Sequence, residues 1–217
     1  TVADDLVTRA DLPDLDAARG LFSLMRAQLM AGQFLDVVES VRPWAELPTA
    51  ERLDRADRVL RYKSAKYSVE HPLLIGALAA HATPEQTAAL SRYGLDVGRA
   101  FQLRDDLLGV FGDPAVTGKP AGDDLREGKR TVLVAATLDR LGPADAARLL
   151  AGLGQDDPAV VAELQALVAG SGGVGWVEVR IDELVDDALE ALTGARLADE
   201  GYAALADLAR RATHRAA

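Results

Sequence analysis

Two short segments combine charged side chains in patterns that helix packing does not require. The first, 62–67, reads YKSAKY, and the second, 101–106, reads FQLRDD. A charged stretch with several glycines, 118–131, follows the second segment. The chain has only four lysines, at 63, 66, 119 and 129, whereas arginine supplies the other 20 basic residues. All four lysines therefore lie within the first segment or the charged stretch.

Asp105 and Asp106 are adjacent carboxylates on an otherwise largely apolar helix. Two such groups repel each other and lose solvation when they are buried. Mg²⁺ resolves this conflict because it takes oxygen ligands and usually shares them with a substrate phosphate. The lysines then fit as counter-charges to phosphate oxygens, so we expect all four ammonium groups to face the acids across one pocket. The alternative is a solvated acidic helix end, since an Asp-Asp pair alone is weak evidence for a metal.

The composition argues against several other kinds of site. The chain has no cysteine, which excludes disulfides, thiolate metal sites and thiol nucleophiles. Its three histidines, His71, His81 and His214, are spaced too far apart to suggest a zinc cluster. A net charge of −10 disfavours binding to nucleic acid. No apolar run reaches the length of a transmembrane segment and no signal peptide is visible, so we expect a cytoplasmic protein.

Apolar residues recur at intervals of three and four along the 217 residues, which is the spacing of helices that bury one side. This pattern, with 49% hydrophobic residues, predicts a single all-α domain over residues 1–217. Helices are expected near residues 14–42, 49–70, 72–82, 84–110, 130–141, 143–153, 158–168, 176–193 and 195–212. The helix at 72–82 is almost entirely apolar, so we expect it to be buried.

Proline and glycine mark the breaks between these helices. Pro43 is expected to end the first helix, and Pro72 to interrupt the chain after the second. Thr83 and Gln86 occupy the two positions of a capping box at the start of the long 84–110 helix. The loop at 112–122 contains three glycines and two prolines, and loops of this length are often functional.

The first long helix becomes polar near its end, where its apolar stripe reaches Gln33 and Asp36. This change indicates a helix that lines the wall of a polar cavity. The alternative, which the pattern supports equally, is that both side chains lie at the solvated edge of the stripe.

Four segments resemble motifs of the trans-isoprenyl diphosphate synthases, also called polyprenyl synthetases. The segment 101–108 resembles the family's second aspartate-rich motif, and 118–131 is similar to the glycine–lysine loop and basic segment that follow it. The segment 62–73 resembles the lysine–threonine motif, with Ser64 at the threonine position. The segment 30–36 looks like the family's GQxxD helix.

The resemblance implies an isoprenoid-synthase-like helical bundle around a central cavity, assembled as a homodimer. It also implies a reaction in which an allylic diphosphate ionises to a carbocation, the double bond of isopentenyl diphosphate attacks it, and a proton is lost. Mg²⁺ is the implied cofactor. The metal and the lysines would stabilise the departing diphosphate, while apolar helices would shield the cation from water.

Candidate site residues follow from the resemblance position by position. Asp105 would hold Mg²⁺ with Asp106 assisting, and the catalytic groups would be Asp105, Lys63 and Lys119. The residues expected to bind substrate or to line its cavity are Lys63, Ser64, Gln102, Lys119, Lys129, Gln33, Asp36 and Phe101.

The sequence departs from the family pattern in two ways. The fifth position of the family's DDxxD pattern is Gly109, so the second motif lacks one possible ligand. The first aspartate-rich motif, its arginine pair and the residues that hold isopentenyl diphosphate precede the matching region in the family, and Asp4-Asp5 is no substitute. We therefore expect this chain to be the C-terminal portion of such an enzyme, with N-terminal helices missing, and to be unable to catalyse condensation alone.

Two other functions remain open at this point. A class I terpene cyclase shares the helical cavity and the ionisation chemistry, but we find no convincing copy of its late-helix metal motif. A non-catalytic helical subunit is the second alternative. Retention of Asp105, Lys63 and Lys119 argues against it, because a scaffold has no need of them.

Overall fold

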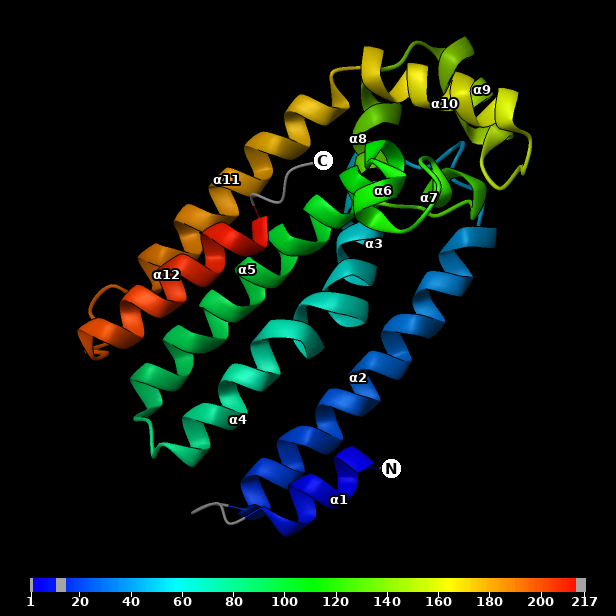
Figure 1. Ribbon diagram of the computed structural model, residues 1–217. Coiled ribbons are helices and arrows are strands. Elements are labelled where there is room, and N and C mark those ends of the chain that lie inside the picture. The colour runs from blue at the N-terminus through cyan, green and yellow to red at the C-terminus, as the bar shows by residue number, and fades with distance from the viewer. Residues whose placement is uncertain (1, 11–14, 214–217) are drawn as a thin grey trace.

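The structure is a computed structural model that describes residues 2–10 and 15–213, and all regular elements within them are helical (Figure 1). The predicted all-α fold is thus confirmed for this part of the chain. In order, the helices are α1 (Val2–Arg9), α2 (Leu15–Val41), α3 (Thr49–Leu60), η1 (Arg61–Glu70), α4 (His71–Ala79), α5 (Pro84–Phe111), α6 (Pro114–Thr117), α7 (Asp123–Arg126), α8 (Val132–Arg140), α9 (Pro143–Gly152), α10 (Pro158–Gly170), α11 (Gly173–Leu192) and α12 (Asp199–Thr213).

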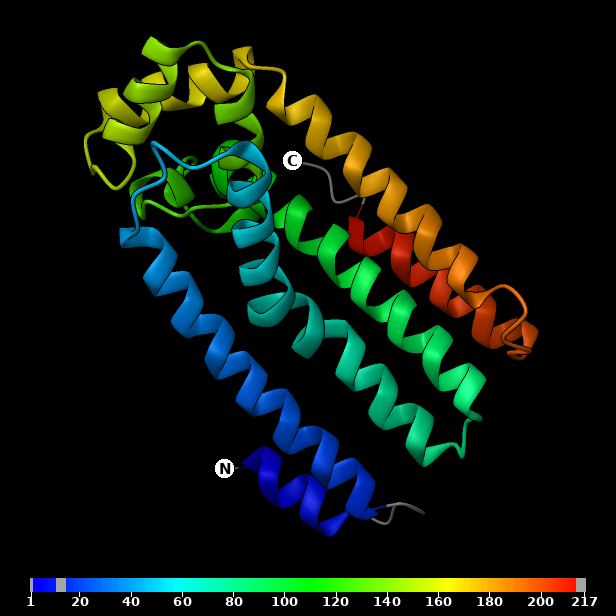
Figure 2. The ribbon, with the colours of Figure 1, turned by 180° about the vertical axis from the view of Figure 1, so that it is seen from behind.

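The long helices run side by side, and the short ones gather at one end. Figures 1 and 2 show α2, the continuous column formed by α3, η1 and α4, then α5, and finally α11 with α12. Helices α6 to α10 lie together at the end of the molecule where α5 finishes and α3 begins. The glycine-rich loop predicted at 112–122 therefore lies over the junction of the long helices.

Helix α5 is the centre of the core. Its capping box at Thr83 and Gln86 is present as predicted, and Tyr93, Val97 and Ala100 are fully buried along one side. Gly98 lets α5 approach η1 closely, because a Cβ there would lie 2.7 Å from the Cα of Ala65. This contact sets the position of η1 along α5, relative to Asp105 and Asp106 near the C-terminal end of α5.

The predicted interruption after the second helix is wrong. Helix α3 continues without a break through η1, which is a π-helix, and then into α4. Pro72 lies in the first turn of α4, where it ends no helix. π-Helical turns are rare and occur often at functional sites, and η1 contains the YKSAKY segment.

The burial predicted for the apolar helix at 72–82 is also wrong. Only His71 and Ala77 are buried in α4, while Leu73, Leu74 and Ile75 are half-buried. Helix α4 packs sideways against α2 and α5, which leaves its other sides uncovered in the described part of the chain. Apolar sequence alone does not reveal how many sides of a helix find a neighbour.

Helices α2, α5 and α8 to α12 agree with the prediction to within a few residues at each end, whereas α1 and α7 were not predicted and α6 lies within the segment predicted as a loop at 112–122. Ser171 and Gly172 separate α10 from α11, and the two helices are bent by 61° relative to each other. Helix α12 begins later than predicted, because Arg196 in the preceding turn has a positive φ of 50°. No single described helix has the length and apolarity to cross a membrane, and α10 with α11 reaches them only as this bent pair.

Candidate active site

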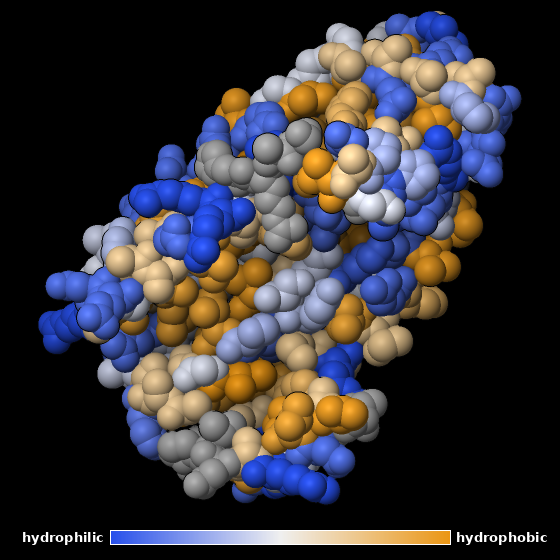
Figure 3. All heavy atoms as spheres, viewed as in Figure 1, coloured by the Kyte–Doolittle hydropathy of each residue, from blue (hydrophilic) through white to orange (hydrophobic). Residues whose placement is uncertain are grey.

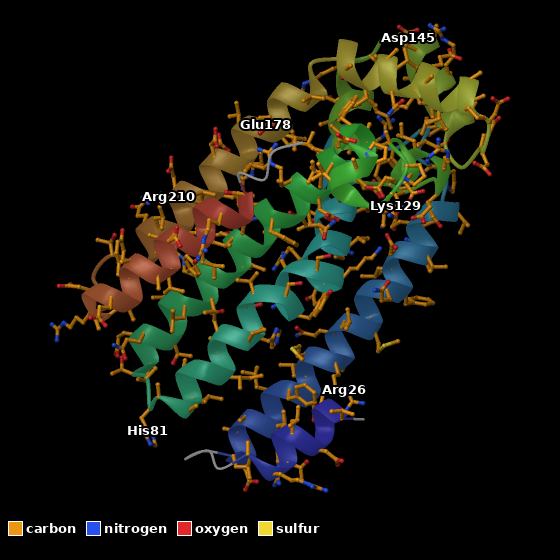
Figure 4. The ribbon with its side chains drawn as sticks, viewed as in Figure 1. Arg26, His81, Lys129, Asp145, Glu178 and Arg210 are labelled. Carbon is orange, nitrogen blue, oxygen red and sulfur yellow. The ribbon has the colours of Figure 1, made fainter. Side chains whose placement is uncertain are left out.

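A cavity of about 240 Å³ lies where α3, η1, α5 and the loop before α8 meet. Lys129, labelled in Figure 4, marks this end of the molecule. Four carboxylates and four cationic side chains line the cavity: Asp36, Asp105, Asp106, Asp124, Lys63, Lys119, Lys129 and Arg130. Ser64, Gln102 and Thr131 add neutral polar groups, and Ala56, Val59, Leu60 and Val132 add an apolar wall.

Most of the residues predicted from the sequence meet in this cavity, but three do not. Gln33 is exposed on α2 and Phe101 is half-buried on α5, and neither lines the cavity. Phe101 directly precedes Gln102, and this single step turns its side chain to another side of α5. Gln33 lies about one helical turn before Asp36 on α2. Lys66 also points elsewhere, because its Nζ lies 2.8 Å from Glu70 and over the ring of Tyr62. The expectation of four lysines in one pocket is therefore wrong for Lys66.

Asp105 and Asp106 occupy different environments although they are adjacent on α5. Asp106 is buried, whereas Asp105 is exposed. Gln102, one turn earlier, donates from Nε2 to Asp106 Oδ1 at 2.9 Å and to Asp105 Oδ2 at 3.3 Å. Burial raises the pKa of Asp106 to about 8, and the nearby carboxylate of Asp124 adds to the effect. The hydrogen bond from Gln102 and the charge of Lys129 lower the pKa of Asp106, but they do not offset its burial.

Asp124 is the acidic residue that the sequence analysis missed. It lies on the short helix α7, and its side chain is buried against Gly109 of α5. A Cβ at Gly109 would lie only 2.2 Å from Asp124 Oδ2, so the carboxylate occupies the space that a side chain at this position would need. Burial raises the pKa of Asp124, although its hydrogen bond to Lys129 acts in the opposite direction. The available signal was an acidic pair, Asp123-Asp124, five residues before a scarce lysine.

Two of the cavity's lysines are already paired with carboxylates. Lys63 Nζ lies 2.5 Å from Asp36 Oδ2, and Lys129 Nζ lies 2.5 Å from Asp124 Oδ1 and 2.8 Å from Glu127. Although burial acts in the opposite direction, the hydrogen bonds to Asp124 and Glu127 raise the pKa of Lys129. Both lysines are therefore held as ammonium groups at the cavity wall.

A close contact between α2 and η1 brings Asp36 to Lys63. Gly32 has no side chain, and a Cβ there would lie 2.3 Å from the backbone nitrogen of Lys63. Asp36 follows one helical turn later on the same side of α2, so its carboxylate reaches the Lys63 ammonium. This geometry gives a physical reason for the glycine in the GQxxD segment.

A tight turn after α7 brings Lys129 back to Asp124. The backbone N–H of Lys129 donates to the Asp124 carbonyl at 3.0 Å, and that of Gly128 donates to the Leu125 carbonyl. Gly128 has a φ of +68°, which glycine adopts without strain in such helix-ending turns. The backbone thus determines which acid the lysine meets.

The donor set fits Mg²⁺ in kind. Asp105, Asp106 and Asp124 offer hard oxygen ligands, and burial, with the carboxylate of Asp124, raises the pKa of Asp106. Within residues 2–10 and 15–213, no group of three or more acidic or histidine side chains lies close enough together to hold an ion alone. Since Mg²⁺ usually keeps several waters and shares its ligands with phosphate, these carboxylates suit a metal that arrives with a diphosphate.

A family model described as polyprenyl synthetase matches residues 6–169. The chain belongs to the polyprenyl synthetase family. Residues from all four segments that resemble this family in the sequence line the cavity.

Individual members of the polyprenyl synthetase family resemble the chain over much of its length. It is 32% identical to a (2E,6E)-farnesyl diphosphate synthase of Mycobacterium bovis, over 96% of this chain and 58% of the relative. It is 42% identical to a geranylgeranyl diphosphate synthase of Mycobacterium tuberculosis, over 56% of this chain and 35% of the relative. The chain thus spans between about a third and three fifths of these relatives.

Solved structures of the family share the fold. The crystal structure of a geranylgeranyl pyrophosphate synthase from Corynebacterium glutamicum, complexed with isoprenyl diphosphate and magnesium, superposes with a TM-score of 0.84 at 41% identity. The match covers 93% of this chain and 56% of that protein. The helical bundle described above is therefore the isoprenyl synthase fold.

Proposed function

We propose that this chain carries the diphosphate-ionising site of a prenyl diphosphate synthase, a prenyltransferase that joins an allylic diphosphate to isopentenyl diphosphate. The observation that carries the proposal is the cavity, where Asp105, Asp106 and Asp124 lie together with Lys63 and Lys119. Clustered carboxylates and ammonium groups around one small space suit a ligand that brings both metal and phosphate. The names of the family relatives support the same activity.

In this proposal the residues divide the work between binding and charge stabilisation. Lys63, Ser64, Gln102 and Lys119 bind the allylic diphosphate, with Lys129 as a further cation. Bound Mg²⁺, held by Asp105 with Asp106 and Asp124, supplies Lewis-acid stabilisation of the leaving diphosphate. The lysines, fixed in advance at the wall, stabilise the same charge as the carbon–oxygen bond breaks, and a proton is lost after condensation.

The apolar wall completes the proposed site. Ala56, Val59, Leu60 and Val132 line the cavity beside the charged groups. A prenyl carbocation reacts rapidly with water, so an apolar surface next to the diphosphate site directs it towards the alkene instead. The predicted roles of Gln33 and Phe101 in substrate binding stay predictions.

The proposed assembly is a homodimer. Met30, Phe34, Val37 and Val41 form an apolar stripe on α2, each between 66% and 80% exposed. Figure 3 shows further apolar surface over the end of the molecule where α1 and α2 lie. A stripe of this kind supports contact with another helical surface, and size-exclusion chromatography with light scattering tests for a second copy. The predicted cytoplasmic location stays a prediction.

Calorimetry with an allylic thiodiphosphate, which resists ionisation, tests the proposed function. We expect Mg²⁺-dependent binding to the 217-residue chain and a large loss of affinity in Lys63→Met. We do not expect condensation by this chain alone, because its sequence contains one aspartate-rich motif of the family's pair. Formation of a longer prenyl diphosphate from isopentenyl and allylic diphosphates would overturn that expectation.

The same samples separate the two alternative functions. A terpene cyclase would release diphosphate from an allylic diphosphate without isopentenyl diphosphate. A non-catalytic subunit would bind no thiodiphosphate at any Mg²⁺ concentration. Either result would contradict the proposed prenyltransferase.

A further inference from the structure

Arg130 differs from Lys63 and Lys129 of the cavity because it has no acidic partner among the described residues. It lines the cavity between Lys129 and Thr131, at the start of α8. Its Nε and Nη1 atoms are buried and have no hydrogen-bond partner among the described residues. Within the same residues it forms no ion pair, whereas Lys63 and Lys129 are each held at 2.5 Å from a carboxylate.

Two other partly buried arginines of this chain, Arg104 and Arg99, are paired with carboxylates. Arg104 makes two hydrogen bonds to Glu178 and a third, through Nε, to the Thr213 carbonyl. Arg99 makes two hydrogen bonds to Asp57. Acceptors are thus present at Arg99 and Arg104, whereas two buried nitrogens of Arg130 have none; Arg61 also has a buried Nε without a partner, but Arg61 does not line the cavity.

Trp44 contacts the guanidinium group of Arg130 through its ring face and accepts no hydrogen bond from it. The guanidinium carbon lies 5.9 Å from the centre of the Trp44 ring, which suits a cation–π contact. Trp44 is itself fixed, because it is 1% exposed and its indole N–H donates to Glu39 at 3.1 Å. A ring face attracts a cation but satisfies no N–H in the guanidinium plane.

A half-buried guanidinium with two buried nitrogens that lack acceptors is costly in the ligand-free protein. Burial lowers the pKa of Arg130, yet an arginine remains charged at neutral pH. Removing such a charge from water without a partner costs free energy, and an anion that enters the cavity recovers it. The planar fork of arginine matches two phosphate oxygens, which a single ammonium group does not.

We propose that Arg130, stacked on Trp44, binds the diphosphate group that enters the cavity. Its buried N–H groups meet phosphate oxygens on the side of the cavity formed by α3 and the start of α8. This inference rests on the proposed function and assigns a fourth cation to the diphosphate beside Lys63, Lys119 and Lys129. The ligand chemistry is a diphosphate, whether free or carried by a prenyl chain.

Inorganic pyrophosphate, titrated with Mg²⁺ present, tests this role in the 217-residue chain. We compare the wild type with Arg130→Met, which keeps much of the bulk against Trp44 but removes the charge, and with Arg130→Lys. Calorimetry is expected to show at least tenfold weaker binding for Arg130→Met and intermediate binding for Arg130→Lys. Arg58→Met removes an exposed arginine paired with Asp54 and serves as the charge-matched control, with binding as in the wild type.

Thermal melts separate a ligand-binding role from a structural one. If Arg130 serves the ligand, Arg130→Met melts no lower than the wild type without pyrophosphate, and its rise in melting temperature with pyrophosphate is smaller. If Arg130 only supports Trp44, the variant melts lower and binds pyrophosphate as tightly as the wild type. That second pattern would overturn the inference.

Tryptophan fluorescence gives a local signal for the same event. The chain has two tryptophans, so Trp176→Phe leaves Trp44 as the reporter. Pyrophosphate is expected to change the Trp44 emission in this background and to leave it unchanged when Arg130→Met is added.

If Arg130→Met binds pyrophosphate normally while Lys63→Met does not, only this inference is overturned. If the wild type binds no pyrophosphate with Mg²⁺, both this inference and the proposed function fall.

Discussion

The carboxylate of Asp124, on α7, lies in the space that a side chain at Gly109 of α5 would occupy. A Cβ at Gly109 would lie 2.2 Å from Oδ2 and 2.5 Å from Cγ of Asp124. The position that departs from the DDxxD pattern is therefore not simply a lost ligand. Its missing side chain admits a carboxylate from α7, so Asp124 lines the cavity together with Asp105 and Asp106.

Gly109→Ala tests this relationship. Alanine normally stabilises a helix relative to glycine by about 1 kcal/mol, but here its methyl group displaces the Asp124 carboxylate. We expect the free energy of unfolding to fall by about 1–3 kcal/mol, as in an overpacked core, and Mg²⁺-dependent pyrophosphate binding to weaken. Urea denaturation and calorimetry measure the two effects.

Gly20→Ala is the matched control, because a Cβ at this helical glycine meets nothing within 4 Å. It should be neutral or slightly stabilising. Adding Asp124→Ala to Gly109→Ala should recover much of the stability but not the binding. If Gly109→Ala and Gly20→Ala have the same free energy of unfolding, the interpretation that Gly109 and Asp124 share one space is contradicted.

The pH dependence of stability should carry the signature of Asp106. Its pKa is raised to about 8 by burial, from an ordinary value of 3.8. Between these values the folded chain holds a proton that the unfolded chain has released, so the free energy of unfolding falls as the pH rises. One such proton contributes a slope of up to about 1.4 kcal/mol per pH unit.

Asp106→Asn should remove this contribution, and urea denaturation from pH 5 to pH 9 in EDTA measures it. Asp105→Asn alters an exposed neighbour and should leave most of the slope in place. If the wild type and Asp106→Asn lose stability with pH at the same rate, Asp106 is not the titrating group.

Lys63 and Lys66 form a matched pair on η1, since one faces the cavity and the other does not. Lys63→Met should weaken Mg²⁺-dependent pyrophosphate binding at least tenfold, because an ammonium group at the diphosphate site is lost. Lys66→Met leaves the buried Glu70 without its cation, so it should lower the free energy of unfolding by about 1–3 kcal/mol with binding unchanged. Similar binding losses in both variants would contradict this division.

Gly32 sets the distance between α2 and η1. A Cβ there would meet the backbone nitrogen of Lys63 at 2.3 Å, and backbone cannot move aside as a flexible side chain can. Gly32→Ala should therefore lower the free energy of unfolding by about 2–3 kcal/mol and weaken pyrophosphate binding, because Asp36 and Lys63 separate. The control is again Gly20→Ala on the same helix, and equal unfolding curves would contradict the argument.

Several features of the fold and the site followed from the sequence alone. The capping box at Thr83 and Gln86 and the prolines that begin later helices act within one turn, so local sequence determines them. The grouping of Lys63, Gln102, Asp105 and Lys119 followed from motif types and their order along the chain. These residues do line one cavity.

Tertiary packing decided the rest. The π-helical turns of η1, the 2.3 Å approach at Gly32 and the entry of Asp124 beside Gly109 each depend on how closely two distant backbone segments meet. The same packing turned Lys66 towards Glu70 and left Arg130 without an acidic partner in the part of the chain that the structure describes. Hydrogen bonding within a turn specifies that a residue is helical, but only the contacts between helices specify which charged side chains share an enclosed space.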